Sequence, residues 1–304
     1  MIGAIDIGGT KIAVGIVDRN GIVEMVETFP TDAKKGPELF IVRVVEWLRA
    51  YTQKMNISLE GVGIGCTGPV YPQSGTIGKL DFLPGWEGFN IVNALSSEMG
   101  VMTALENDAD ATALGEWAWG CGKDTNNFIM VTIGTGIGVG LVLDGKLYRG
   151  VDGAHPEIGH HFIDPSGPKC SCGGRGCWES LASGPAMVKW ARNQQPKKLY
   201  RNAQEICSAS ILGDNLAERI VKREAFYLGL GLANLVTLFT PQVIALGGGV
   251  MASHELFMPT IMESVRLTCG YVPREKVKII PVPLDNNAGV RGAAKVWLNR
   301  YQIT

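Results

Sequence analysis

The chain has 304 residues, of which 46% are apolar, and its 28 basic and 29 acidic side chains give a formal net charge of −1. This length and apolar content suffice for two packed domains, and the balanced charge argues against nucleic acid or a membrane surface as a partner. No apolar run reaches the ~20 residues of a transmembrane helix. The N-terminus lacks the basic segment and cleavage site of a signal peptide, so we expect a cytoplasmic protein.

The first predicted element is a strand at residues 2–5, and a glycine-rich turn with the sequence DIGGTK follows it at residues 6–11. A phosphate needs converging backbone N–H groups with no Cβ in the way, so such a turn can bind a nucleotide. Asp6 would then hold Mg²⁺ through waters beside the phosphates. The alternative is an aspartate that only caps the turn. A strand at 14–17 and an Asn20-Gly21 turn predict a hairpin.

A helix is predicted at residues 37–49, where apolar residues recur at helical spacing behind a proline. Farther along, a strand at 101–105 leads into a second helix at 108–119. Asn107 at this junction can donate to and accept from a pair of hydroxyls, and Asp108 can accept a proton. Capping of the positive end of the helix explains these residues equally well.

A second strand and glycine-rich turn repeat the first pair. The strand is predicted at residues 128–131, the turn IGTGIGVG spans 133–140, and a hairpin turn follows at Asp144-Gly145. Aligned without a gap on Ile7 and Ile133, the two hairpins match as far as their turns. One glycine cluster alone could be a plain turn, and strands on both sides exclude the dinucleotide motif, which needs a following helix. The repeat favours two similar α/β domains.

The most specific pattern is one histidine with three closely spaced cysteines. The candidate ligands are His160, Cys170, Cys172 and Cys177. A Cys₃His set is typical of a closed tetrahedral zinc site with no position for a reactive water, so we predict a structural zinc. The alternative is three buried thiols beside an unrelated histidine. Glu157 and Glu179 flank the ligands, and the two carboxylates with the free nitrogen of the histidine could bind neighbouring sugar hydroxyls. We interpret His155 and His161 as structural residues.

The last part of the chain predicts a long helix at residues 214–239, a strand at 243–246 and a closing helix at 286–300. A third glycine cluster, LGGGV at residues 246–250, lies at the end of this strand. We place one domain at 1–117 plus 290–304 and the other, with the zinc cluster, at 118–289.

These motifs, from DIGGTK to the segment Glu157-x-x-His160 through Glu179, resemble those of the ROK group (repressor, open reading frame, kinase) of sugar kinases, within the actin-like, hexokinase-type ATPase superfamily. The similarity runs essentially end to end. It implies an α/β fold of two actin-like (ribonuclease H-like) domains with an active-site cleft between them. It also implies ATP-dependent phosphorylation of a hexose, with zinc on the Cys₃His set.

The resemblance implies a role for each residue, with Asp108 as the catalytic base. The implied sugar-binding residues are Asn107, Asp108, Glu157, His160 and Glu179. The implied nucleotide-binding residues are Asp6, Gly8, Gly9, Thr10, Lys11, Gly134, Thr135, Gly136, Gly138, Gly248 and Gly249. We expect a small-molecule sugar and ATP as ligands, no nucleic acid, no membrane, and a homo-oligomer that is a dimer or a tetramer.

The cysteine spacing resembles the glucokinase branch, so D-glucose is the predicted acceptor and glucose 6-phosphate the product. Phe82, however, stands where many glucokinases of the group have asparagine, and His155-Pro156-Glu157 resembles the fructokinase branch. The alternatives are a kinase for N-acetylmannosamine, N-acetylglucosamine, mannose or fructose, and a sugar-binding ROK regulator. Such regulators usually have a winged helix-turn-helix ahead of the first glycine turn, which begins here at residue 6.

Overall fold

The computed structural model describes residues 1–283, 285 and 287–302. The chain divides into two compact units, which are described separately below. Unit 1 comprises Met1–Asn126, Gly140–Pro156 and Asp285–Thr304, and unit 2 comprises Asn127–Val139 and Glu157–Leu284. The predicted domains differ from this division, because the segments 118–126 and 140–156, which we expected in the second domain, belong to unit 1, and unit 1 resumes at Asp285 and not at residue 290. Within the described ranges, no helix combines the length and apolarity needed to cross a membrane.

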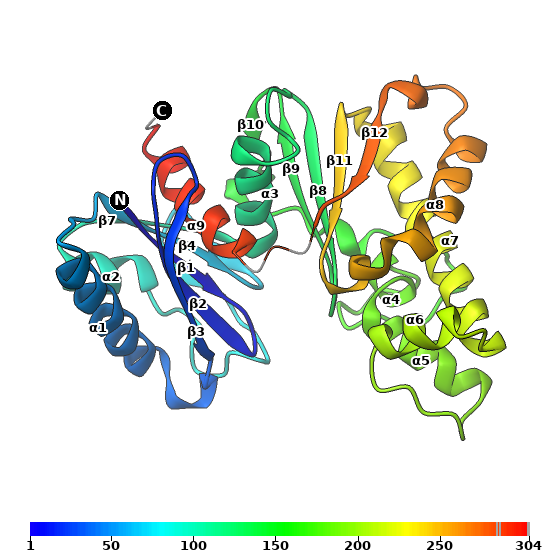
Figure 1. Ribbon diagram of the computed structural model, residues 1–304, viewed down its shortest axis with the longest axis horizontal. Helices are drawn as coiled ribbons and strands as arrows, with labels where there is room; N and C mark the ends of the chain where they lie inside the picture. Colours follow the sequence, from blue (N-terminus) through cyan, green and yellow to red (C-terminus); the bar gives the residue numbers. More distant parts are fainter. Residues whose placement is uncertain (284, 286, 303–304) are drawn as a thin grey trace. The chain divides into compact units, whose positions relative to one another are not determined.

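A five-stranded sheet forms the centre of unit 1 (Figure 1). Its strands are β1 (Ile2–Ile7), β2 (Lys11–Val17), β3 (Val23–Pro30), β4 (Gly61–Cys66) and β7 (Met102–Asn107). The order is β3-β2-β1-β4-β7; β2 runs antiparallel to β1, whereas β4 and β7 run parallel to it. Ile7, Cys66 and Asn107 are partners in register, so three parallel strands end side by side. Ligands of open α/β sheets bind at such carboxyl ends.

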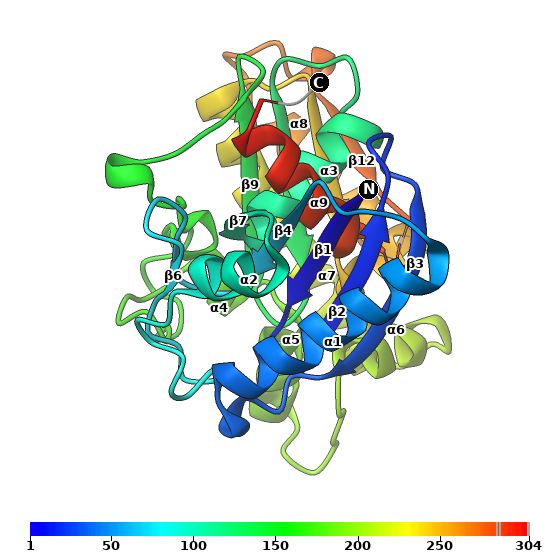
Figure 2. The same cartoon turned by 90° about the vertical axis from the view of Figure 1, so that its left-hand side faces the viewer.

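Helices cover both faces of this sheet. Helices α1 (Pro37–Met55) and α2 (Ile91–Met99) lie on one face, as Figure 2 shows, while α3 (Asp108–Trp119) and α9 (Ala288–Arg300) pack together on the other. Successive strand residues point to opposite faces, so β1 supplies both cores. Ile5 and Ile7 join the cluster on the α1 side, and Ile2 and Ala4 join the cluster on the α9 side.

The C-terminal helix packs very closely on the sheet because glycines leave room for it. A Cβ at Gly63 would lie 1.8 Å from the carbonyl oxygen of Ala293, and a Cβ at Gly61 would lie 2.0 Å from Nε1 of Trp297. Trp297 is 1% exposed, and its indole N–H donates to the carbonyl oxygen of Met102 at 3.0 Å. Helix α9 is therefore part of the core of unit 1.

The second sheet has the strand order β10-β9-β8-β11-β12, which repeats the order of the first. Its strands are β8 (Phe128–Ile133), β9 (Ile137–Leu143), β10 (Lys146–Leu147), β11 (Val243–Gly247) and β12 (Lys278–Pro281). Strands β8, β11 and β12 belong to unit 2, and β9 passes into unit 1 at Gly140. The β9–β10 turn has positive φ at both Asp144 (50°) and Gly145 (71°), which is the conformation predicted from this Asp-Gly pair.

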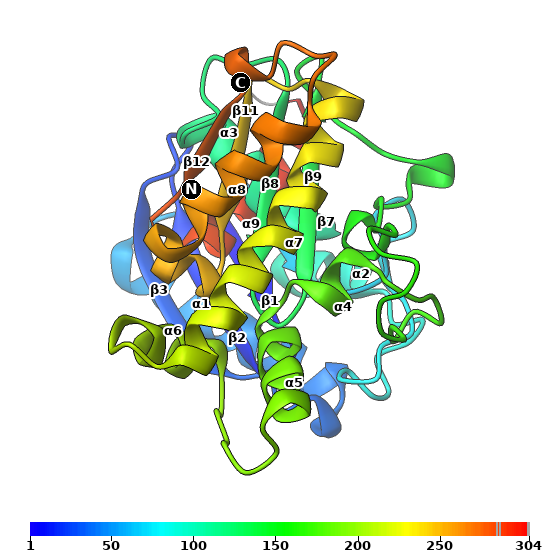
Figure 3. The same ribbon diagram turned by 90° about the vertical axis from the view of Figure 1, so that its right-hand side faces the viewer.

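The long helix α7 (Asn215–Phe239) lies beside α8 (His254–Thr268) across the strands of unit 2 (Figure 3). Three shorter helices pack on α7. They are α4 (Trp178–Leu181), α5 (Gly184–Gln194) and α6 (Ala203–Ile211). The remaining short elements are β5 (Val70–Tyr71), β6 (Thr76–Ile77), and the 3₁₀ helices η1 (Ala33–Lys35), η2 (Val151–Gly153), η3 (Ile158–His160), η4 (Gly249–Ser253) and η5 (Arg274–Lys276).

The predicted helix at 108–119 is confirmed with the same bounds. The long helix begins one residue later than predicted, because Asp214 is its N-cap and accepts from the N–H groups of Leu216 and Ala217. The first helix continues to Met55, six residues past its predicted end. The described part of the last helix begins at Ala288; its predicted start at 286 lies outside the described residues.

Candidate active site

The first glycine turn joins β1 to β2 in unit 1. The N–H of Gly8 donates to the carbonyl oxygen of Lys11 at 3.0 Å, which closes the turn, and the side chains of Thr10 and Lys11 are exposed. A Cβ at Gly9 would lie 2.9 Å from Cδ2 of Phe82, so the aromatic ring covers this glycine. The turn thus has a glycine where the backbone and a side chain approach each other closely.

Asp6 and Asp108 are neighbours at the carboxyl ends of the parallel strands. A Cβ at Gly65 on β4 would lie 3.9 Å from Oδ1 of Asp6 and 3.8 Å from the Cα of Asp108. Burial raises the pKa of Asp6 to about 7, the charge of Asp108 adds to the rise, and Lys11 opposes it. A divalent cation beside bound phosphates would favour the ionised form of such a carboxyl group.

Asn107 is the N-cap of α3. Its Oδ1 accepts from the N–H groups of Ala109 at 2.9 Å and Asp110 at 3.3 Å, so helix capping, which we left open, is one of its functions. The side-chain amide donates to the carbonyl oxygen of Gly68 at 3.4 Å. Because Asn107 is buried and bonded on both sides, it fixes the path of the backbone into Asp108.

Asp108 is half-buried at the first position of α3, and one of its oxygens accepts from the N–H of Ala109 at 2.9 Å. Burial raises the pKa of this carboxyl group most, and the backbone N–H of Ala109, the charge of His155 and the hydroxyl of Thr67 lower it. A carboxylate with a raised pKa is a better proton acceptor than an ordinary surface aspartate.

The other two acidic residues of this segment are buried and paired. Asp110 is 0% exposed, and its Oδ2 lies 2.5 Å from Nη1 of Arg149 and 2.6 Å from Nδ1 of His155. Arg149 also forms an ion pair with Glu106, and all of these residues are in unit 1. We missed this network, because Arg149 and His155 are 39 and 45 residues from Asp110 and no sequence spacing connects them.

In unit 2 the second glycine turn joins β8 to β9. The N–H of Gly134 donates to the carbonyl oxygen of Gly136 at 2.9 Å. The N–H of Ile137 donates to Oε2 of Glu179 at 2.9 Å, and a Cβ at Gly136 would lie 2.3 Å from that oxygen. Glycine at 136 therefore leaves room for the carboxylate of Glu179 in this position against the turn.

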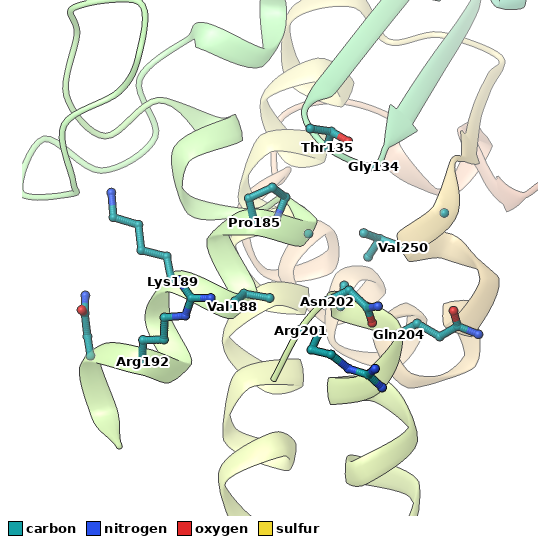
Figure 4. Close-up of a pocket in the computed structure, with 14 residues that line it drawn as sticks. Gly134, Thr135, Pro185, Val188, Lys189, Arg192, Arg201, Asn202, Gln204 and Val250 are labelled. Carbon is teal, nitrogen blue, oxygen red and sulfur yellow. The ribbon is translucent and has the colours of Figure 1, made fainter. Parts of the chain in front are cut away.

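A pocket of about 870 Å³ opens beside this turn, and Figure 4 shows its lining. Gly134 and Thr135 of the second turn and Gly249 and Val250 of the third glycine cluster belong to the lining. Gly248, with φ of +90°, adjoins it: a Cβ there would lie 2.4 Å from the carbonyl oxygen of Ile133. The second and third glycine clusters therefore meet at one pocket.

Helix α5, the first residues of α6 and the two residues before α6 supply the rest of the pocket, which we did not predict. The polar side chains are Lys189, Arg192, Asn193, Arg201, Asn202 and Gln204. Lys189 and Arg192 lie on one side in Figure 4, Arg201 lies away from them, and no acidic residue belongs to the lining. Ser183 and Pro185 were a usable signal for α5, since serine followed by proline is typical of a helix start.

The four predicted metal ligands come together in unit 2. One donor atom from each of His160, Cys170, Cys172 and Cys177 lies within 4.8 Å of the others. Nδ1 of His160 lies 3.4 Å from Sγ of Cys170, and the sulfurs of Cys172 and Cys177 are 3.5 Å apart. Tetrahedral ligands at ~2.3 Å from zinc are roughly 3.8 Å apart, so these residues could hold such an ion.

The residues that flank this cluster have distinct environments. Glu157 is exposed at the start of η3, and Glu179 lies on α4, two residues after Cys177. His161 is bonded at both ring nitrogens, to the carbonyl oxygen of Ile158 at 2.6 Å and to the amide of Asn234 at 3.1 Å. Its contacts agree with the structural function that we expected.

Residues 2–300 of the chain match the ROK family. Among curated relatives, glucokinase from Thermotoga maritima is 31% identical, with 97% of this chain and 96% of that protein aligned. The xylose repressor of Bacillus spizizenii is also 31% identical, but the aligned 98% of this chain spans only 77% of the repressor.

Among solved structures, a ROK family glucokinase from Streptomyces griseus, in complex with glucose and AMPPNP, has a TM-score of 0.78 to this chain. The two are 31% identical, with 97% of this chain and 98% of that chain covered. The predicted actin-like α/β fold class is confirmed by this similarity and by the sheets described above.

Proposed function

The chain belongs to the ROK family and is a sugar kinase, and from this premise we propose that it transfers the γ-phosphoryl group of ATP to D-glucose. The main support for this reaction is the position of Asp108. It is a half-buried carboxylate at the carboxyl ends of three parallel strands, held by its own helix and next to Asp6. A sugar hydroxyl that attacks phosphorus must lose its proton, and Asp108 is the proposed acceptor.

In the proposed site, ATP binds at the glycine-rich turns. The pocket beside Gly134 and Gly249 would hold the adenosine, and the N–H groups of the turns would contact phosphates. Mg²⁺ held near Asp6 would neutralise phosphate charge. The proposed sugar contacts remain Asn107, Asp108, Glu157, His160 and Glu179. In the proposed reaction, Asp108 takes the proton as the oxygen–phosphorus bond forms and the bond to the leaving ADP breaks.

We propose that the Cys₃His cluster binds a structural zinc. The proximity of the four donor atoms supports this assignment. Nδ1 of His160 faces the sulfurs, which leaves Nε2 available for a sugar hydroxyl. In Cys172→Ala we expect loss of the metal and at least a 10²-fold loss of activity through misplaced sugar contacts. Cys121→Ala, which removes a half-buried thiol outside the cluster, is the matched control. Less than about half an equivalent of zinc in active wild-type protein would refute the assignment.

Glucose as the acceptor is supported by the cysteine spacing and by the similarity to glucokinases. The test is kcat/KM with ATP and Mg²⁺ for glucose, fructose, mannose, N-acetylglucosamine and N-acetylmannosamine. Glucose should have the highest value. An N-acetylhexosamine or fructose with the highest value would refute the substrate and leave the kinase chemistry intact. No ADP release with any sugar would instead favour a sugar-binding regulator, as the similarity to the xylose repressor would then suggest.

A further inference from the structure

Three carboxyl groups lie within five residues at the start of α3: Glu106, Asp108 and Asp110. Glu106 is 9% exposed and Asp110 is 0% exposed, whereas Asp108 is half-buried. Burial raises the pKa of both Glu106 and Asp108 most, and the charge of Asp110 adds to the rise in each. Without compensation, a proton held by this cluster would block the acceptor that the proposed reaction needs.

Two basic side chains from one segment of unit 1, Arg149 and His155, face the two buried carboxylates. Arg149 forms ion pairs with both Glu106 and Asp110, and Nδ1 of His155 lies 2.6 Å from Oδ2 of Asp110. Neither Arg149 nor His155 is an exposed side chain, with 19% and 12% of their side-chain surfaces accessible. Ion pairs in such surroundings are screened far less than surface pairs.

We propose that Arg149 and His155 are positioning residues for Asp108: by neutralising Glu106 and Asp110 they leave Asp108 as the one uncompensated carboxylate of the segment. The inference rests on the proposed function of Asp108 as the base. The ion pairs of Arg149 and His155 join these residues to Glu106 and Asp110 and not to Asp108 itself. The inference therefore gives this network an indirect function in the reaction.

Several other groups also face Asp108. Asp6 approaches it from β1, Cys66 and Thr67 lie at the end of β4, and Asp110 follows on the same helix. Among these neighbours, His155 lowers the pKa of Asp108 and Asp110 raises it, although burial has the largest effect. His155 and Asp110 therefore act in opposite directions on the pKa of Asp108, so removing the charge of Asp110 should offset part of the loss of His155.

The test compares His155→Gln with the double variant His155→Gln/Asp110→Asn. In the single variant the acidic limb of the kcat/KM–pH profile should move up by about one pH unit, because the charge of His155 no longer lowers the pKa of Asp108. In the double variant the limb should move back toward the wild-type position, since the charge of Asp110, which raises the pKa of Asp108, is removed as well. ¹³C NMR titration of the Asp108 carboxyl group, assigned with Asp108→Asn, should show the same two shifts.

Arg149→Gln gives an independent measurement. It leaves two buried carboxylates with one fewer cation, so kcat at pH 7 should fall at least roughly tenfold, with recovery at higher pH. Arg19→Gln is the matched control, because Arg19 forms an exposed ion pair with Glu60 in the same unit. Its pH profile should be that of the wild type.

An unchanged titration of Asp108 in His155→Gln would overturn the proposal. So would a double variant that is further impaired than the single one, since a merely structural network loses more with each broken contact. If the wild type phosphorylated no hexose, the proposed function would fail, but the NMR titrations would still decide whether the network controls the ionisation of Asp108.

Discussion

The three acidic residues around the start of α3 are alike in sequence but differ in how accessible their side chains are. Glu106 and Asp110 are buried and paired with Arg149, while Asp108 is half-buried and bonded mainly to its own backbone. A group that is to receive a proton from a substrate must be reachable and must not be held by a permanent partner. Of the three, only Asp108 combines these properties.

Asp108→Asn keeps the shape of the side chain but removes the proton acceptor. General-base catalysis contributes roughly 10²–10⁴-fold, so kcat should fall by at least that order while the Kd for the sugar changes little. Steady-state kinetics and equilibrium binding measure the two quantities. Asp124→Asn is the control, because Asp124 is exposed with φ of +64°, a conformation that asparagine tolerates. Retention of a tenth of the wild-type kcat in Asp108→Asn would show that Asp108 is a cap and not the base.

Glu224 on α7 is a second unusual carboxyl group. It is 0% exposed, neither oxygen has a hydrogen-bond partner among the described residues, and burial raises its pKa well above the ordinary value. The folded protein therefore holds the neutral acid, whereas the unfolded chain releases the proton above about pH 4.5. The contribution of Glu224 to the free energy of unfolding is therefore greatest below about pH 4.5, and it decreases as the pH rises toward the folded-state pKa.

Glu224→Gln should remove this pH dependence. Relative to the wild type, its free energy of unfolding should rise with pH above about pH 4.5, by at most about 1.4 kcal/mol for each pH unit, until the folded-state pKa of Glu224 is reached. Urea titrations at several pH values measure the difference. Glu263→Gln, at an exposed position of α8, should show no such trend. Parallel stability curves for the wild type and Glu224→Gln would contradict the assignment of a neutral buried acid.

The site residues that could be predicted are those with a local signal. The glycine turns, the Cys₃His spacing and the strand-to-helix junction at Asn107 are each contained within a short segment. Arg149 and His155 could not be predicted, because a loop far along the chain delivers them to Asp110 and their positions carry no periodicity. Long-range ion pairs depend on the packing of whole elements, which residue spacing does not encode.

At the scale of elements, the glycine hairpins illustrate how a turn is fixed by its neighbours. The ring of Phe82 packs against Gly9, whereas the carboxylate of Glu179 packs against Gly136. The β1–β2 and β8–β9 hairpins have corresponding places in their sheets, but different side chains pack against their glycine turns. Glycine is needed at both places for close approach and not for an unusual φ.

Gly136→Ala would place a Cβ 2.3 Å from Oε2 of Glu179, so the carboxylate must move away from the N–H of Ile137. We expect kcat/KM for the hexose to fall roughly 10²-fold, because the carboxylate of Glu179 is a proposed sugar contact and a misplaced contact group lowers the rate by about that factor. Gly270→Ala, where a Cβ has open space, should behave as the wild type. Normal kcat/KM in Gly136→Ala would mean that Glu179 has no part in sugar binding.

Among the elements, those with strong end signals could be predicted. Helix α3 has its cap and its acidic first turn, and α7 has Asp214 before it and Pro241 after it. Helix α2 was missed although Asn90 caps it and Gly100 ends it, because nine residues give little periodicity. Strand β4 was also missed, since it is buried throughout and alternates apolar residues with glycine.

At the scale of the whole molecule, two sheets have the same strand order, and the chain passes between the two units four times, after residues 126, 139, 156 and 284. The repeat of the hairpins predicted the similar sheets. The exchange of segments could not be predicted from it, because the crossings fall inside a strand and in loops without a compositional change. The last helix completes a core whose first strand begins at residue 2.

Trp297→Ala should therefore destabilise unit 1 although it lies seven residues from the end of the chain. The loss of a buried tryptophan that fills the space above Gly61 should cost about 3–5 kcal/mol of unfolding free energy. Asn299→Ala, at an exposed position of the same helix, should cost less than about 0.5 kcal/mol. Denaturant unfolding measures both, and equal effects would show that α9 is not part of the core.

One hydrogen bond joins the segment of the proposed zinc site to a turn of the proposed nucleotide site, so we expect the filling of one site to affect the other. The carboxylate of Glu179, two residues after the last cysteine of the metal cluster, accepts the N–H of Ile137 in the second glycine turn. Zinc that orders the cluster would therefore also reduce the entropy lost when a nucleotide orders the turn. Thermodynamic reciprocity then requires that nucleotide raise the affinity for zinc by the same factor. A shortage of metal would thus be measured first as weaker nucleotide binding, before any loss of folded protein.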